Sequence, residues 1–236
     1  MSSLRQPVRL PVPDEGEEAS IPPLENGDHL DQKTFHARYE AMPEQTRAEL
    51  IGGIVYMASP LKRPHGRLHV CATHWLAEYE YATPGVETFD NATNILGEES
   101  EPQPDLCLLI APDKGGQTRT EDDYIVGPPE LIVEIASSTE SVDLHAKRRD
   151  YQQAGVREYV VVALRQARVF WFVSRHGQFE ELSLGDDGIL RSLTFPGLWL
   201  DPTALVRREG ARIREVLQQG LASPEHAAFV TRLAGS

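Results

Sequence analysis

The middle of the chain alternates strand-like apolar runs with one helix-like segment, and this alternation constrains the fold more than any other feature. The runs cover residues 105–110, 131–136 and 158–164, and each has the length of a strand. Between the last two runs, residues 141–154 follow helical spacing, and Gly155 is typical of a helix end. A strand at residues 168–173 should pair with the run before it. The pattern predicts a mixed α/β core.

Short signals place further elements before this core. A helix is predicted over residues 34–41, and in AELIGGIVYMASP the pair Gly52-Gly53 between two apolar runs indicates a tight hairpin that carries Glu49 on its first strand. Apolar residues then recur at helical spacing from residue 65 to 81, which predicts a long amphipathic helix.

The two ends of the chain have a different composition. Residues 1–30 are Pro-rich and acidic, which predicts a disordered tail outside the core. Residues 31–205 then form one domain, and residues 206–236 form a helical extension, with one helix expected at 204–217 and another after Pro224. That extension could cover a partner or fold back on the domain.

Length and charge narrow the function classes. A chain of 236 residues with 40% hydrophobic content can form one good-sized core. Its formal net charge of -13 excludes a broad basic surface, so a nucleic-acid role must be local or metal-assisted. Cys71 and Cys107 lie in apolar surroundings, which favours buried thiols and a reducing compartment. With no signal-like or membrane-spanning segment, we expect a soluble, cytoplasmic protein.

Two carboxylates and a lysine stand in apolar surroundings, where an unpaired charge is costly. Strand alternation places Glu134 on the face shared by Ile132 and Ala136, and helical phase places Lys147 on the same stripe as Tyr151. If that helix packs on that strand, the lysine should meet the glutamate or a shared ligand.

Asp105 completes this group if its strand is a neighbour of the strand that carries Glu134. Pro104 suits a strand start, so Asp105 should lie near an opening of the sheet. Two carboxylates could then converge on one hard cation, Mg²⁺ or Mn²⁺, which also binds phosphate oxygens. Such a site would hydrolyse a phosphodiester, with the lysine positioning water or offsetting negative charge.

At these residues the chain resembles the Uma2 family of endonucleases, a branch of the PD-(D/E)XK nucleases. The resemblance covers roughly residues 34–205, and its motifs are AELIGGIVYMASP, PQPDLCLLI, PPELIVEIASSTE and DLHAKRRDYQQAGVREYVVV in that order. It implies a restriction-endonuclease-like fold, a mixed central sheet flanked by helices. It also implies Asp105 and Glu134 as metal ligands, Lys147 as the catalytic lysine and Glu49 as a further acidic residue. A DNA substrate and a homodimer are implied as well.

The chain departs from the superfamily pattern at two positions. Ala136 stands two residues after the second acid, where a lysine is usual, so the resemblance implies that Lys147 reaches in from the helix. Gly52 stands where an aspartate commonly follows the family's first glutamate segment.

Each candidate also has an ordinary structural interpretation. Asp105 could cap a strand entry, Glu134 and Lys147 could form a structural ion pair, and Glu49 could be a solvated hairpin residue. His65 could lie at the mouth of the site or simply begin its helix. Its spacing to His69 suits a zinc pair, but HGRLH lacks the glutamate of HExxH.

Three functions follow from these residues. The first is a metal-dependent DNA endonuclease that uses Asp105, Glu134 and Lys147, with Arg148 and Arg149 as secondary phosphate contacts. The alternative is a catalytically inactive nuclease-fold protein that acts as an interaction or nucleic-acid-binding module. A third is hydrolysis of a sugar bond by paired carboxylates, against which an adjacent lysine argues because it lowers a carboxyl pKa.

Overall fold

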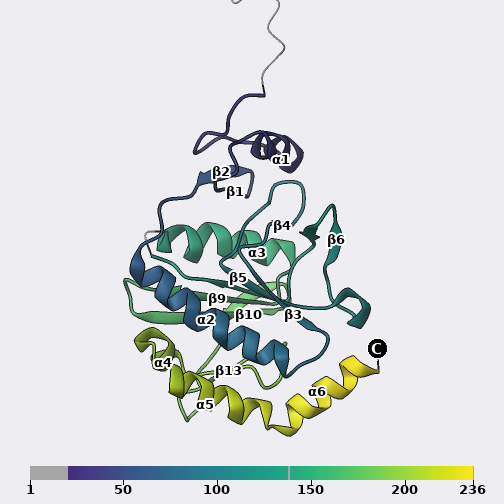
Figure 1. Cartoon of the computed structure of the whole chain (residues 1–236), viewed down its shortest axis with the longest axis vertical. Helices are drawn as coiled ribbons and strands as arrows, with labels where there is room; N and C mark the ends of the chain where they lie inside the picture. Colours follow the sequence, from purple (N-terminus) through teal and green to yellow (C-terminus); the bar gives the residue numbers. More distant parts are fainter. Residues whose placement is uncertain (1–20, 138, 236) are drawn as a thin grey trace, which may run out of the picture.

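A mixed six-stranded sheet forms the centre of the computed structural model, which describes residues 21–137 and 139–235 (Figure 1). The strand order is β11-β10-β9-β8-β5-β3, with β8 and β9 parallel and every other neighbouring pair antiparallel. This arrangement confirms the predicted mixed α/β class. The strands are β3 (Val86–Asp90), β5 (Leu106–Ile110), β8 (Leu131–Glu134), β9 (Glu158–Ala163), β10 (Arg168–Arg175) and β11 (Gln178–Glu181).

The parallel pair β8 and β9 is joined by a helical crossover over the sheet, as a parallel connection requires. The crossover was predicted as one α-helix, but its first part, η2 (Val142–Lys147), is a π-helix, and only α3 (Arg148–Ala154) is α-helical. Gly155 ends α3 at φ +92°, a left-handed conformation that glycine adopts without a Cβ penalty.

Alternate residues of the central strands contribute to two separate apolar layers. Leu131 and Val133 pack in the layer under the long helix α2 (Arg63–Tyr81), whereas Ile132 packs in the layer under α3 with Tyr151. Figure 1 shows the sheet between α3 on one side and α2 with the C-terminal helices on the other. The predicted alternation along β8 is therefore confirmed.

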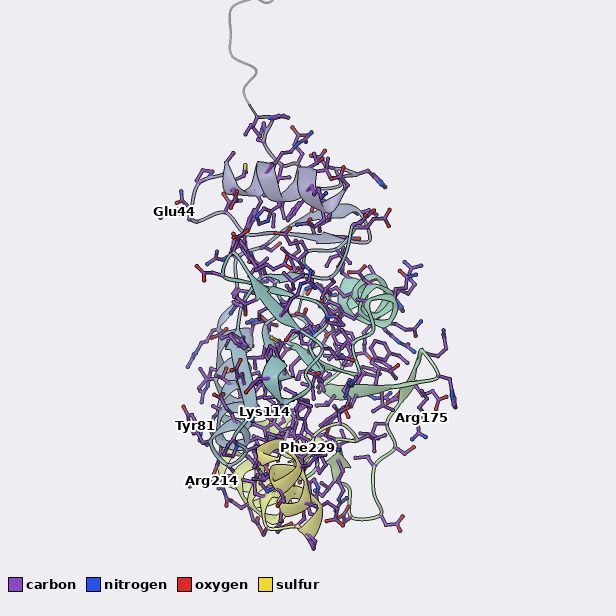
Figure 2. All side chains as sticks on the ribbon, turned by 90° about the vertical axis from the view of Figure 1, so that its right-hand side faces the viewer. Glu44, Tyr81, Lys114, Arg175, Arg214 and Phe229 are labelled. Atoms are coloured by element: carbon purple, nitrogen blue, oxygen red, sulfur yellow. The ribbon has the colours of Figure 1, made fainter. Side chains whose placement is uncertain are left out.

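A third, smaller cluster lies at one end of the molecule, around α1 (Gln32–Glu40) and the hairpin of β1 (Ala48–Ile51) and β2 (Ile54–Met57). Gly52 and Gly53 form the predicted turn, with φ of +56° and +76°. Figure 2 shows this end, marked by Glu44, opposite the end that carries Phe229.

The predicted tail is wrong in its last part. Its first twenty residues lie outside the described residues, but the segment after them packs on the hairpin: Leu24 is 5% exposed in the third cluster, and Leu30 N–H donates to the Gly53 carbonyl at 2.9 Å. Leu24 and Leu30 supply the apolar surface that the Pro-rich composition concealed.

The C-terminal helices fold back on the layer under α2. The helix predicted over residues 204–217 is interrupted, because Arg208 adopts a left-handed φ of +61° between two shorter helices. Ile213, Leu217, Phe229 and Leu233 are buried in the same layer as the central strands. The helices are α4 (Pro202–Arg207), α5 (Gly210–Leu221) and α6 (Pro224–Ala234). The predicted domain boundary at residue 205 stays a prediction.

Several short elements lie outside the central sheet. The polar stretch at 113–123 contains the end of a 3-10 turn and a strand of a small three-stranded sheet. In the described part of the chain, no helix is long and apolar enough to cross a membrane. The short elements are β4 (Asn94–Ile95), η1 (Pro112–Lys114), β6 (Arg119–Glu121), β7 (Tyr124–Val126), β12 (Leu190–Arg191) and β13 (Trp199–Leu200).

Candidate active site

Lys147 and Glu134 meet in the interior, as strand alternation and helical phase predicted. Each residue is 5% exposed, and Lys147 Nζ lies 2.9 Å from Glu134 Oε1. The Tyr151 hydroxyl, one turn further along α3, donates to the same oxygen at 2.9 Å. The end of β8 and the crossover helix therefore jointly fix the Glu134 carboxylate.

Glu49 approaches the same lysine from the hairpin. Lys147 Nζ lies 2.9 Å from both of its carboxylate oxygens, and Glu49 Oε1 also accepts a hydrogen bond of 2.8 Å from the Gln103 backbone N–H. The ordinary interpretation of Glu49 as a solvated hairpin residue is therefore wrong. Its antiparallel partner Tyr56 lies opposite it on β2 and lines the same cavity.

Asp105 lies one residue before β5, next to the end of β8. Its Oδ2 accepts a hydrogen bond of 2.6 Å from the Ile135 N–H, which ties the two neighbouring strands together beyond their ladder. Its Oδ1 lies 3.2 Å from His65 Nε2, within ion-pair range but without hydrogen-bond geometry. The His65 Nδ1 is 2.9 Å from the Ile135 carbonyl oxygen. Asp105 thus serves as a strand-end cap and also faces the cavity.

Asp143 belongs to this group, although the sequence analysis missed it. It lies four residues before Lys147, its side chain accepts a 2.7 Å hydrogen bond from Thr139, and its Oδ1 is 3.9 Å from Lys147 Nζ. Burial raises the pKa of Asp143 to about 6. The spacing of Asp143 and Lys147 in the sequence already indicated this contact, because helix residues four apart share one face.

One cavity of about 530 Å³ joins these side chains. Four carboxylates line it near Lys147, and three of them lie within 3.9 Å of its Nζ, so negative charge is in excess at the cavity floor: Glu49, Asp105, Glu134 and Asp143. Burial raises the pKa of Glu134 well above its ordinary value, against the opposing effect of Lys147. Burial lowers the pKa of Lys147, but the surrounding carboxylates raise it more, so the lysine stays charged.

The donor set of this cavity fits a hard divalent cation. Among the described residues, the hydrogen bonds that Glu134 accepts end on Oε1 and none ends on Oε2, and Glu134 and Asp105 line the same cavity. Mg²⁺ takes one or two carboxylates and keeps several waters. Within residues 21–137 and 139–235, no cluster of three or more His, Cys, Asp or Glu has the arrangement of a metal site.

The remaining sequence candidates divide between the cavity and the surface. His65 is buried and lines the cavity beside Asp105. His69 turns to the Asp105 carbonyl and Asp90. Arg148 lies 4.1 Å from the Phe172 ring and outside the cavity, so it is not a phosphate contact at this site.

The two departures from the nuclease pattern have structural counterparts. Ala136 is fully buried, and its N–H donates to the Val162 carbonyl at 3.0 Å. A lysine there would have to enter the apolar layer under α3, whereas Lys147 brings an amino group to Glu134 from the helix. Gly52 is left-handed at φ +56° in the hairpin turn.

The fold itself is that of a nuclease-like protein. The chain is similar to a solved structure described as "a putative nuclease belonging to DUF820" from Anabaena variabilis ATCC 29413, with a TM-score of 0.51 and 14% identity over 72% of this chain and 97% of that one. At this identity the likeness concerns the fold alone, and it confirms the predicted fold class.

Sequence comparison gives the family. Residues 34–203 match the Uma2 family, whose description is "Putative restriction endonuclease", and the chain belongs to this family. Among curated proteins, none matches the chain. Family and fold together support an endonuclease.

Proposed function

We propose that the chain is a metal-dependent endonuclease that hydrolyses phosphodiester bonds of DNA, with Mg²⁺ or Mn²⁺ held by Asp105 and Glu134. The observation that carries the proposal is a group of four buried or partly buried carboxylates, three of them within 3.9 Å of Lys147 Nζ, in a cavity open to solvent. An excess of negative charge is unfavourable in a purely structural cluster, and a divalent cation compensates it.

The residues of the site have distinct tasks in this proposal. When bound, the cation would act as a Lewis acid and lower the pKa of a water molecule that it holds. Lys147 holds Glu134 Oε1 in place and brings positive charge to the cavity floor, where a phosphate would otherwise be repelled. Glu49 positions the lysine, because it binds Nζ through both oxygens and is itself fixed by Gln103. Each chain carries one such cavity among its described residues, so a double-strand cut needs the predicted homodimer.

Plasmid cleavage in Mg²⁺ or Mn²⁺ tests the proposal. Glu134→Gln and Lys147→Met should each abolish cleavage while far-UV circular dichroism stays that of the folded protein. Glu130→Gln is the matched control, because Glu130 is another buried acid next to β8 that accepts backbone hydrogen bonds and lies outside the cavity. Cleavage that survives both site substitutions would sink the assignment.

The rival function is an inactive nuclease-fold module, and one observation favours it. Lys147 and Glu134 are close enough to serve only as an ion pair that holds the crossover helix to the sheet. Calorimetric titration with Mn²⁺ separates the two, since the rival expects no heat that depends on Asp105. The expected argument against hydrolysis of a sugar bond, a carboxyl pKa lowered by the lysine, does not hold for Glu134, because burial raises its pKa against the effect of Lys147.

A further inference from the structure

The mouth of the cavity carries charge opposite to its floor. Arg47 and Lys62 line the opening, and Arg63 and Arg67 are exposed on the first two turns of α2 directly after it. We call these four residues the basic rim. Across the described residues, none of the four side chains has an ion-pair or hydrogen-bond partner. In a chain with a net charge of -13, two unpaired cations at the cavity opening and two more on the adjoining turns of α2 indicate an anionic ligand.

The start of α2 strengthens this anionic preference. Lys62 is the N-cap residue and makes no side-chain capping bond, and the first turn contains no acidic residue. The helix dipole and the free N–H groups therefore favour an anion at this end. Independently, His65 is 5% exposed and lines the cavity, and its Nε2 makes no hydrogen bond among the described residues, although Asp105 Oδ1 lies 3.2 Å from it.

The depth of the site limits the form of that ligand. Glu134 and Lys147 are nearly inaccessible, so a phosphodiester must enter the cavity to reach them. A duplex is stiff, with a persistence length of about 150 base pairs, so bending it into such a recess is penalised. A single strand is flexible enough to enter it. The mouth also presents Tyr56 and Leu61, the latter 72% exposed, and an aromatic face next to cations is typical of single-strand binding sites.

We propose that the mouth of the cavity binds one unpaired nucleic-acid strand, whose phosphates contact the basic rim and one of whose bases stacks on Tyr56. The inference rests on the proposed function only for the position of the cut, because binding by the rim needs no catalysis. It specifies that the enzyme acts on single-stranded segments or on one strand at a time.

Fluorescence anisotropy with a labelled DNA strand of about 12 nucleotides, within the range of known single-strand sites, tests the binding step. The same strand annealed to its complement is the second probe, and a chelator prevents cleavage. Four phosphate contacts predict that log K falls with log [salt] with a slope of about -2.8, at about -0.7 per contact for single strands. The single strand should bind at least about 10-fold more tightly than the duplex, since an aromatic base contact alone supplies about that factor.

The quadruple variant Arg47→Gln/Lys62→Gln/Arg63→Gln/Arg67→Gln should remove most of this slope. A matched control replaces Lys33, Arg165, Arg207 and Arg208 by glutamine, which removes the same numbers of lysines and arginines. These four residues are also exposed and lack side-chain ion-pair or hydrogen-bond partners among the described residues, but they do not line the cavity. The control should keep the slope and affinity of the wild type. Tyr56→Leu should weaken binding by about 5-fold or more without changing the slope.

Two results would overturn the inference. One is a rim variant whose slope equals that of the control, and the other is a duplex bound as tightly as the single strand. Failure of the proposed function looks different: the strand would bind through the rim as described, but no plasmid cleavage would occur with Mg²⁺ or Mn²⁺. If the protein cleaves plasmid but the rim variant keeps the salt slope of the wild type, the rim is refuted and the proposed function is not.

Discussion

Replacement of Lys147 by methionine should destabilise the protein strongly. Methionine has a similar length and suits a buried position, so the change mainly removes the charge. Among the described residues, it leaves Glu134 Oε1 with only the Tyr151 hydroxyl and Glu49 with only the Gln103 N–H. Removal of one partner from a buried ion pair lowers the free energy of unfolding by about 3–5 kcal/mol. For a chain of this size, that corresponds to a fall in Tm of about 6–20 °C.

The double variant Glu134→Gln/Lys147→Met should recover part of this loss, because the introduced amide would still accept a hydrogen bond from Tyr151 and would carry no charge that needs a partner. We expect a coupling free energy of about 2 kcal/mol between the two substitutions. Urea unfolding in a chelator, followed by circular dichroism, measures all four corners of the cycle. Lys33→Met, at an exposed lysine, should change stability by less than about 0.5 kcal/mol. Additive effects, or a loss below about 1 kcal/mol for Lys147→Met, would refute the reasoning.

Three further predictions concern metal binding, pH and the C-terminal helices. Asp105→Asn and Glu134→Gln should each weaken Mn²⁺ binding at least about 10-fold by calorimetry. Burial raises the pKa of Asp150 to about 6. Its contribution to the free energy of unfolding is therefore present below about pH 4 and lost as the pH rises through 6. Asp150→Asn should remove up to ~3 kcal/mol of that pH dependence in urea unfolding. Phe229→Ala should lower stability by about 3 kcal/mol in the same assay, because Phe229 is 2% exposed in the layer under α2.

The sequence was sufficient to predict the contact between Lys147 and Glu134. Both side-chain directions follow from local periodicity, and the apolar neighbours of each residue show which face is buried. It was not sufficient to predict the π-helical start of the crossover, because an i to i+5 turn depends on how the chain meets the sheet.

Long-range packing explains what else was missed. Leu24 has no periodic neighbours, so only the folded hairpin gives it a place to pack. The edge strand β3 has a largely polar sequence, VETFD, that carries little strand signal by itself and is held by its ladder with β5. The burial of Glu49 likewise depends on Lys147, which is 98 residues away in sequence.

Carboxylates reach Lys147 from three elements: the end of β8 and the crossover helix, which share one apolar layer, and the hairpin, which packs in the separate third cluster. A displacement of the hairpin relative to the sheet would withdraw Glu49 and release the lysine from one of its anchors. The geometry of the site therefore depends on how the hairpin is placed relative to the central sheet, which has a different core. Native-state hydrogen exchange of the β1 and β2 amides would measure how often the hairpin opens.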